Sequence, residues 1–244
     1  MVNYEEAVKK PFTDLAKLFL GIVLSTIPIV NWVAQGFIIE CSGVGKNRPS
    51  KSMPVWKELG NLFSKGFLSI LIMIIYAIPA ILVFLITFGY AASLLMPTLG
   101  GLMPEGFISS VVTGQVTGEE ISGVVSQNSM QILPALTEAS IIVFPFLLLG
   151  MILLLAAIYL YPIAILNYLK NKKFGKAFDF NFIISKAFTA KYLISWLIAG
   201  ITSIVIKSFL VSISWVGLWL GPAIAFFISG VIAYSLFGQV FREK

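Results

Sequence analysis

The chain has 244 residues, of which 58% are hydrophobic and only 11% are charged, and its mean hydropathy is +0.95. A soluble domain of this length carries about 25% charged residues, so this composition excludes a soluble globular protein and indicates a polytopic membrane protein. The chain contains no histidine and a single cysteine, Cys41. These counts argue against a metal centre, an internal disulfide and histidine-based acid–base catalysis, and we expect no cofactor.

The first apolar stretch, 18–39, follows a segment of mixed charge and is broken near its middle. Pro28 removes a helix hydrogen-bond donor, and Asn31 adds a polar break three residues later. Each half then has about 12 residues, or roughly 18 Å of helix, which is too short to cross a hydrocarbon core of about 30 Å. We favour a re-entrant hairpin, and a kinked span is the alternative.

The remaining apolar sequence predicts an all-α membrane bundle that forms a single domain over 1–244. Four segments are long enough for transmembrane helices: 66–96, 139–165, 193–213 and 216–238. Two amphipathic segments, 53–65 and 176–192, are expected to be interfacial helices. The segment 97–138 is rich in Gly, Ser and Thr and is expected to be a partly ordered outer loop.

The distribution of basic residues predicts the topology, and it accounts for the net charge of +6 without nucleic-acid binding. The connections 40–65 and 166–192 together hold eleven Lys and Arg residues, whereas 97–138 holds none. We therefore expect a multi-pass protein of the cell membrane with both basic connections in the cytoplasm. The C-terminus is then cytoplasmic, as is the N-terminus if 18–39 re-enters.

Several stretches are similar to a known membrane family. The chain runs from Pro11-Phe12 through Ile27-Pro28-Ile29-Val30-Asn31 and Gly36-Phe37 to Met53-Pro54-Val55-Trp56, Leu62-Phe63 and Gly66, and it ends with Phe237-Gly238-Gln239-Val240-Phe241-Arg242-Glu243. These features resemble an uncharacterised integral-membrane family of archaea and bacteria, catalogued as a domain of unknown function. The resemblance covers nearly the whole chain apart from 97–138 and is most specific at 11–66. It implies a membrane fold and no activity.

Few polar side chains lie at membrane depth. Asn31 and Gln35 are one helical turn apart, and they either stabilise the break or line a polar cavity. Lys207 is placed to extend its ammonium to the outer headgroups, and the alternative is a charge on a substrate or ion path. Ala225, Ser229 and Ala233 form a small-residue stripe that predicts close helix packing, within the chain or in a homo-oligomer.

These features give three hypotheses of function. The first is a non-enzymatic membrane scaffold that binds membrane lipids or a protein partner through its basic, aromatic cytoplasmic face. The candidate residues of that face are Lys170, Lys172, Lys173, Lys176, Trp56 and Phe178. The second is a small transporter or channel subunit with a polar site at Asn31, Gln35 and Lys207. An enzyme is not expected, because no carboxylate pair shares a helix face within a span.

Overall fold

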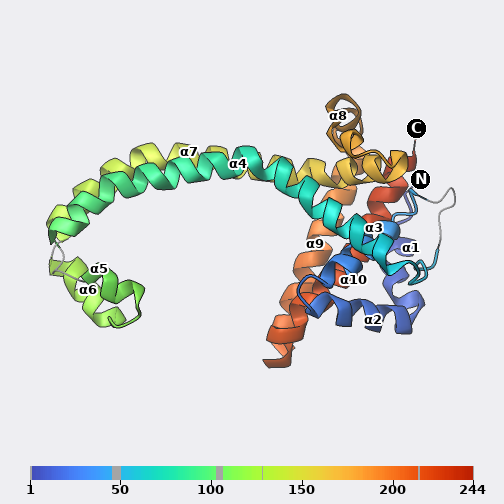
Figure 1. Ribbon diagram of the computed structural model, residues 1–244, viewed down its shortest axis with the longest axis horizontal. Coiled ribbons are helices and arrows are strands. Elements are labelled where there is room, and N and C mark those ends of the chain that lie inside the picture. The colour runs from blue at the N-terminus through green and yellow to red at the C-terminus, as the bar shows by residue number, and fades with distance from the viewer. Residues whose placement is uncertain (1, 46–50, 103–106, 128, 214, 244) are drawn as a thin grey trace. The chain divides into compact units, whose positions relative to one another are not determined.

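Figure 1 shows a computed structural model of the chain, which describes residues 2–45, 51–102, 107–127, 129–213 and 215–243. The described residues are helical without a strand, and this confirms the predicted all-α class. In chain order the elements are α1 (Tyr4–Lys9), η1 (Lys10–Thr13), α2 (Leu15–Thr26), α3 (Asn31–Glu40), α4 (Leu59–Leu102), α5 (Phe107–Val112), α6 (Gly118–Gln127), α7 (Ser129–Asn171), η2 (Phe174–Phe178), α8 (Phe180–Ala187), α9 (Ala190–Ile213) and α10 (Trp215–Arg242).

Four helical segments of the described chain are long and apolar enough to cross a membrane, as the sequence predicts. They are Leu59–Pro97, Leu136–Asn171, Ala190–Leu210 and Leu220–Arg242. The first has 39 residues and the second 36, which is nearly twice the length of about 20 that a bilayer requires. The protein is therefore a membrane-helix bundle.

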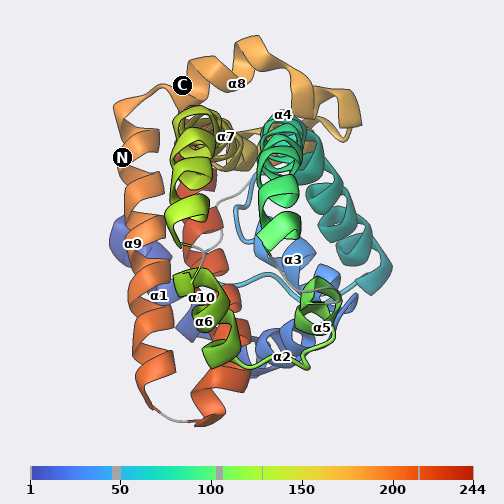
Figure 2. The ribbon, with the colours of Figure 1, turned by 90° about the vertical axis from the view of Figure 1, so that its left-hand side faces the viewer.

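The chain forms two compact units, whereas the sequence led us to expect one domain. One unit contains residues 1–76 and 157–244, and the other contains 77–156. In the second unit, α4 and α7 run side by side (Figures 1 and 2). Phe84 of α4 fits against Gly150 of α7 so closely that a Cβ at position 150 would lie 2.6 Å from its ring. The ring thus fills the space that the glycine leaves.

The described parts of 97–138 are mainly helical, which differs from the expected outer loop. α4 continues past Pro97 to Leu102, and α7 begins at Ser129. α6 begins after a capping box, in which the Thr117 N–H donates to the Glu120 carboxylate at 2.8 Å and the Glu120 N–H donates to the Thr117 hydroxyl at 3.3 Å. This Thr-x-x-Glu signature is readable in the sequence and explains why the segment forms helix.

The broken segment forms a helical hairpin. Asp14 caps α2 by accepting a hydrogen bond from the Lys17 N–H, and the chain reverses after Thr26, where Ile29 takes a φ of +69° before α3 begins. The Lys10 amine, which precedes α2, donates to the carbonyl of Cys41, which follows α3, at 2.7 Å. The two flanks of the hairpin therefore meet, which agrees with the hairpin and disfavours the kinked span.

The expected interfacial helix over 53–65 is not a separate element. Residues 53–58 are not helical, Glu58 takes a φ of +53°, and α4 then runs without interruption through Gly66. The segment 176–192 likewise divides into η2, α8 and the first turn of α9. In the first case the apolar helical pattern of 59–65 continues directly into that of the span, so one helix is formed.

Helix α3 packs against its neighbours backbone to backbone. A Cβ on Gly36 would lie 1.9 Å from the carbonyl oxygen of Leu62, and one on Gly66 would lie 1.8 Å from that of Trp32. On the other side, a Cβ on Gly238 of α10 would lie 2.1 Å from the carbonyl oxygen of Ser42, just after α3. Three glycines thus permit α3 to lie between α4 and α10.

This packing gives a prediction for stability. Gly36→Ala and Gly66→Ala should each lower the free energy of unfolding by about 1–3 kcal/mol, because the new methyl group must displace backbone. Thermal unfolding of the purified protein in detergent measures the effect. Gly200→Ala in α9 is the matched control, because nothing lies within 4 Å of its Cβ position, and it should be neutral or slightly stabilising. Equal midpoints for the three variants would contradict the close packing.

Candidate functional site

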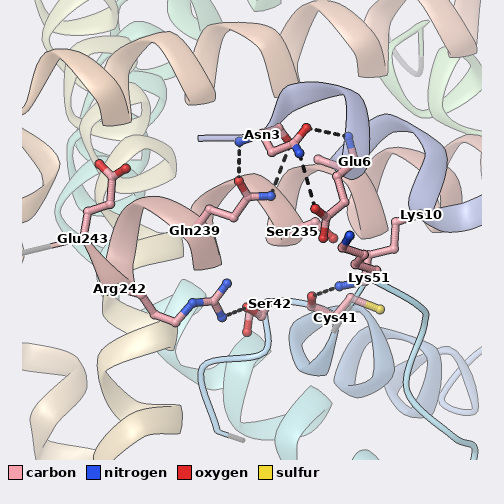
Figure 3. Close-up of a pocket in the computed structure, with 11 residues that line it drawn as sticks. Asn3, Glu6, Lys10, Cys41, Ser42, Lys51, Ser235, Gln239, Arg242 and Glu243 are labelled. Atoms are coloured by element: carbon pink, nitrogen blue, oxygen red, sulfur yellow. Dashed lines mark hydrogen bonds between the residues drawn. The ribbon is translucent and has the colours of Figure 1, made fainter. Parts of the chain in front are cut away.

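Two cations from opposite ends of the chain cap the C-terminal end of α3 (Figure 3). The Lys10 amine donates to the Cys41 carbonyl at 2.7 Å, and the Arg242 guanidinium donates to the Ser42 carbonyl at 2.7 Å. The last carbonyls of a helix have no hydrogen-bond donor within it and carry partial negative charge. A cation at this end supplies both a donor and a compensating positive charge. We call these two residues and their carbonyl partners the α3 clamp.

The clamp borders a polar cavity of about 450 Å³, in which α1, α10 and the end of α3 meet. Asn3 and Gln239 hold α1 to α10 through two hydrogen bonds, from the Asn3 N–H to the Gln239 Oε1 at 2.6 Å and from the Gln239 Nε2 to the Asn3 carbonyl at 3.3 Å. Glu6 also lines this cavity (Figure 3). Both chain ends are therefore fixed to one side of the bundle.

The charges around the clamp are partly buried. Lys10 is only 5% exposed, and burial lowers the pKa of its amine, with the charge of Glu6 opposing that shift. At the end of α10, Lys191 donates to Glu243 at 2.6 Å and lowers the pKa of that carboxyl to about 2. The Lys191–Glu243 pair is a structural contact that joins the start of α9 to the end of α10, beside the clamp.

The basic connection, which we define as residues 170–189, is pinned to the bundle by its backbone. Hydroxyls of α4 and α7 donate to it, from Tyr76 to the Ala177 carbonyl and from Tyr159 to the Ala187 carbonyl, each at 2.7 Å. On its inner face Ile183 and Ala187 are completely buried. The connection is thus held in one conformation, with its other face outward.

The outward face of the basic connection carries the predicted lysines. Lys170, Lys172, Lys173 and Lys176 are all exposed, and Lys170 lies 5.8 Å from the centre of the Phe241 ring. Lys176 pairs with Asp179 at 2.9 Å and lowers the pKa of that carboxyl. Four exposed apolar side chains accompany them: Phe174, Phe180, Ile184 and Phe188. The same short segment therefore carries exposed lysines and exposed apolar side chains.

Of the two predicted aromatic members of this face, Trp56 lies apart from the basic connection, whereas Phe178 belongs to it, in η2. Trp56 stacks on Phe37 of α3, with ring centres 3.8 Å apart and planes 10° apart, and on Phe227 of α10. Phe178 is half-buried and stacks on Tyr76. Trp56 therefore packs against the core around α3 and does not belong to the basic connection. Phe174 and Phe180, which sequence reasoning did not name as candidates, are the aromatic side chains exposed on the basic connection.

The structure separates Asn31 from the other two residues of the predicted polar site. The Asn31 Oδ1 is buried and has no hydrogen-bond partner among the residues that the structure describes. Gln35 instead donates to the Tyr161 hydroxyl at 3.5 Å and lines a groove between α9 and α10. Lys207 lines the same groove, which has a volume of about 820 Å³. We call this hollow the α9–α10 groove.

The small-residue stripe of α10 packs within the chain at its first position and borders the groove at the others. Ala225 is fully buried, whereas Ser229 and Ala233 line the α9–α10 groove. Ser229 donates back to the Ala225 carbonyl at 2.5 Å. A role of this stripe in a homo-oligomer stays a prediction.

The α3 clamp gives a second prediction for stability. Lys10→Met should lower the free energy of unfolding by about 1–3 kcal/mol, because it leaves the Cys41 carbonyl without its charged donor. Lys9→Met is the matched control, since Lys9 is exposed and its surface pair with Glu5 contributes at most about 1 kcal/mol. Thermal unfolding in detergent compares the two. If Lys9→Met lowers the free energy of unfolding as much as Lys10→Met does, the clamp does not stabilise the fold more than a surface ion pair.

Comparison with known proteins identifies a family and no closer relative. Neither the curated proteins nor the solved structures contain a match to the chain. A family model described as "Protein of unknown function (DUF4013)" matches residues 19–216, from the hairpin through α9 to the start of α10. This match confirms the resemblance to an uncharacterised membrane family. Because it covers most of the sequence, the chain belongs to this family of unknown function.

Proposed function

We propose that the protein is a non-enzymatic protein of the cell membrane that binds anionic lipid headgroups through the outward face of its basic connection. The observation that carries this proposal is the combination of exposed lysines with exposed phenylalanines on a segment whose backbone is fixed. Lysines near an anionic leaflet contribute about 1 kcal/mol each, and aromatic rings favour the membrane interface. Such a surface can hold lipid headgroups without first becoming ordered.

The geometry of α8 supports this proposal. Ile183 and Ala187 are buried against the bundle, while Phe180 and Ile184, at neighbouring positions around the same helix, are 52% and 46% exposed. An amphipathic helix at a bilayer surface presents apolar side chains to the acyl boundary beside basic residues. The exposed lysines at 170–176 come just before this helix in the chain.

A transporter or channel subunit is the second candidate, and one observation favours it. Gln35 and Lys207, which are distant in sequence, line one groove. We rank this function lower because Asn31 does not line that groove and because most of the surface that lines it is apolar. A polar solute would need more polar groups along such a path.

We further propose that the basic connection and both chain ends face the cytoplasm, following the asymmetry of Lys and Arg. In a background with Cys41 replaced by alanine, Lys172→Cys should be shielded in intact cells from a thiol reagent that cannot cross the membrane. Gly114→Cys, in the segment without basic residues, should react. Labelling of position 172 from outside, with permeabilised cells as the reference for full reactivity, would overturn the orientation.

The headgroup proposal predicts a loss of affinity when the four lysines are neutralised. The full chain in detergent is titrated with short-chain phosphatidylglycerol, with phosphatidylcholine of the same chain length as the neutral reference. Replacing Lys170, Lys172, Lys173 and Lys176 by Gln should weaken phosphatidylglycerol binding roughly tenfold to a hundredfold, less so at high salt, where charges are screened. The matched variant with four Arg should bind normally. Equal affinities of the Gln and Arg variants would refute the proposal.

A further inference from the structure

The α9–α10 groove is a second lipid-facing feature, separate from the basic connection. α9 and α10 lie side by side as an antiparallel pair (Figure 2), and a Cβ added to Gly221 of α10 would lie 3.4 Å from the Cβ of Leu210 of α9. The groove runs along α10 from Gly221 to Tyr234, which corresponds to about 20 Å of helix. Its length and its volume of about 820 Å³ fit an extended apolar chain.

The groove exists because α10 presents small residues along it. Gly221, Ser229, Gly230 and Ala233 all line it, and none of them has a side chain large enough to fill the space beside α9. Ile38 of α3 forms one wall of the groove. A Cβ added to Gly230 would lie 3.0 Å from the Ile38 side chain, so the two residues are in close contact. The walls are mainly apolar, so the groove suits an occupant from the hydrocarbon region.

The polar groups that α9 adds to the groove lie one turn apart. Lys207 is exposed, it has no ion-pair partner among the described residues, and no Asp or Glu lines the groove. Between Lys191 and Arg242 it is the only Lys or Arg in the sequence. Ser203, about 6 Å along the same helix face, makes no hydrogen bond within the described chain, whereas Ser229 donates to its own helix. A cation and a free hydroxyl thus lie beside an apolar groove.

We propose that the α9–α10 groove holds one acyl chain of an anionic membrane phospholipid, with the phosphate against Lys207 and the ester carbonyl as an acceptor for the Ser203 hydroxyl. Charge complementarity selects this occupant, because the bilayer supplies phosphates at the depth that a lysine side chain reaches from near the end of a span. A zwitterionic lipid such as phosphatidylcholine also offers a phosphate, but its choline cation offsets the attraction to the Lys207 ammonium, so the anionic lipid binds more tightly. This inference does not rest on the proposed role of the basic connection.

The experiment uses the full chain in phosphatidylcholine nanodiscs that contain a trace of phosphatidylglycerol with a photoreactive diazirine in its acyl chain. Phosphatidylcholine with the same diazirine chain is the matched probe. After irradiation, labelled positions are mapped by mass spectrometry of peptides. The outward side chains of α9, Ile201, Ile204 and Val205, are 59–65% exposed and report ordinary lipid contact within the same sample.

The expected result is preferential labelling of groove positions by the phosphatidylglycerol probe. Lys207→Gln should reduce this preference about fivefold, the weight of one lysine near anionic lipid, while labelling at Ile201, Ile204 and Val205 stays unchanged. Lys207→Arg should retain the preference. The four-lysine variant of the basic connection should also retain it, which separates this test from that of the proposed function.

A second pair of variants tests the apolar part of the groove. Ser203→Phe places a ring in the groove and should reduce groove labelling by both probes, whereas Ser208→Phe, on another face of α9, should not. An unchanged preference in Lys207→Gln, or equal effects of the two Phe variants, would overturn the proposal. A stable dimer that Ser203→Phe dissociates would also overturn it and assign the groove to a second copy of the chain.

Discussion

The contact on which the rest of the first unit depends is the close approach of α3 to α4 and α10 through Gly36, Gly66 and Gly238. Within a membrane there is little hydrophobic drive between helices, so close backbone packing and hydrogen bonds determine which helices associate. Glycine at these three positions lets a helix of only ten residues contact two long ones along its length. Phe37 of the same helix stacks on Trp56, with ring centres 3.8 Å apart.

The carbonyls at and just after the C-terminal end of α3 have no partners within the helix and carry partial negative charge. The α3 clamp supplies them from Lys10 and Arg242, which lie near opposite ends of the chain. The two terminal segments are therefore required to complete a helix in the middle of the unit. This explains why the Asn3–Gln239 contact and the Lys191–Glu243 pair gather at the same end of the bundle.

Sequence reasoning succeeded where the signal is local and failed where it depends on distant partners. Apolar length predicted the four spans, and Pro28 with Asn31 predicted the break. Helix α6 carried a readable capping signal at Thr117, while the Gly and Ser content of the segment favoured a loop. By contrast, nothing local to Trp56 indicates that it stacks in the core. The amphipathic pattern of a surface helix also fits the start of a long span.

The hairpin thereby acquires a role that differs from the polar site expected of a broken membrane helix. Its polar residue Asn31 packs inward, and the face with Gln35 and Ile38 forms one wall of the α9–α10 groove. The glycine contacts fix that wall against α10, and the clamp fixes the end of α3. The break therefore determines the shape of the groove. It brings the short helix α3 back beside α10, where the small residues of α10 leave the groove open. A continuous span in its place could not put both flanks at the clamp, because about 22 helical residues would separate them by roughly 33 Å.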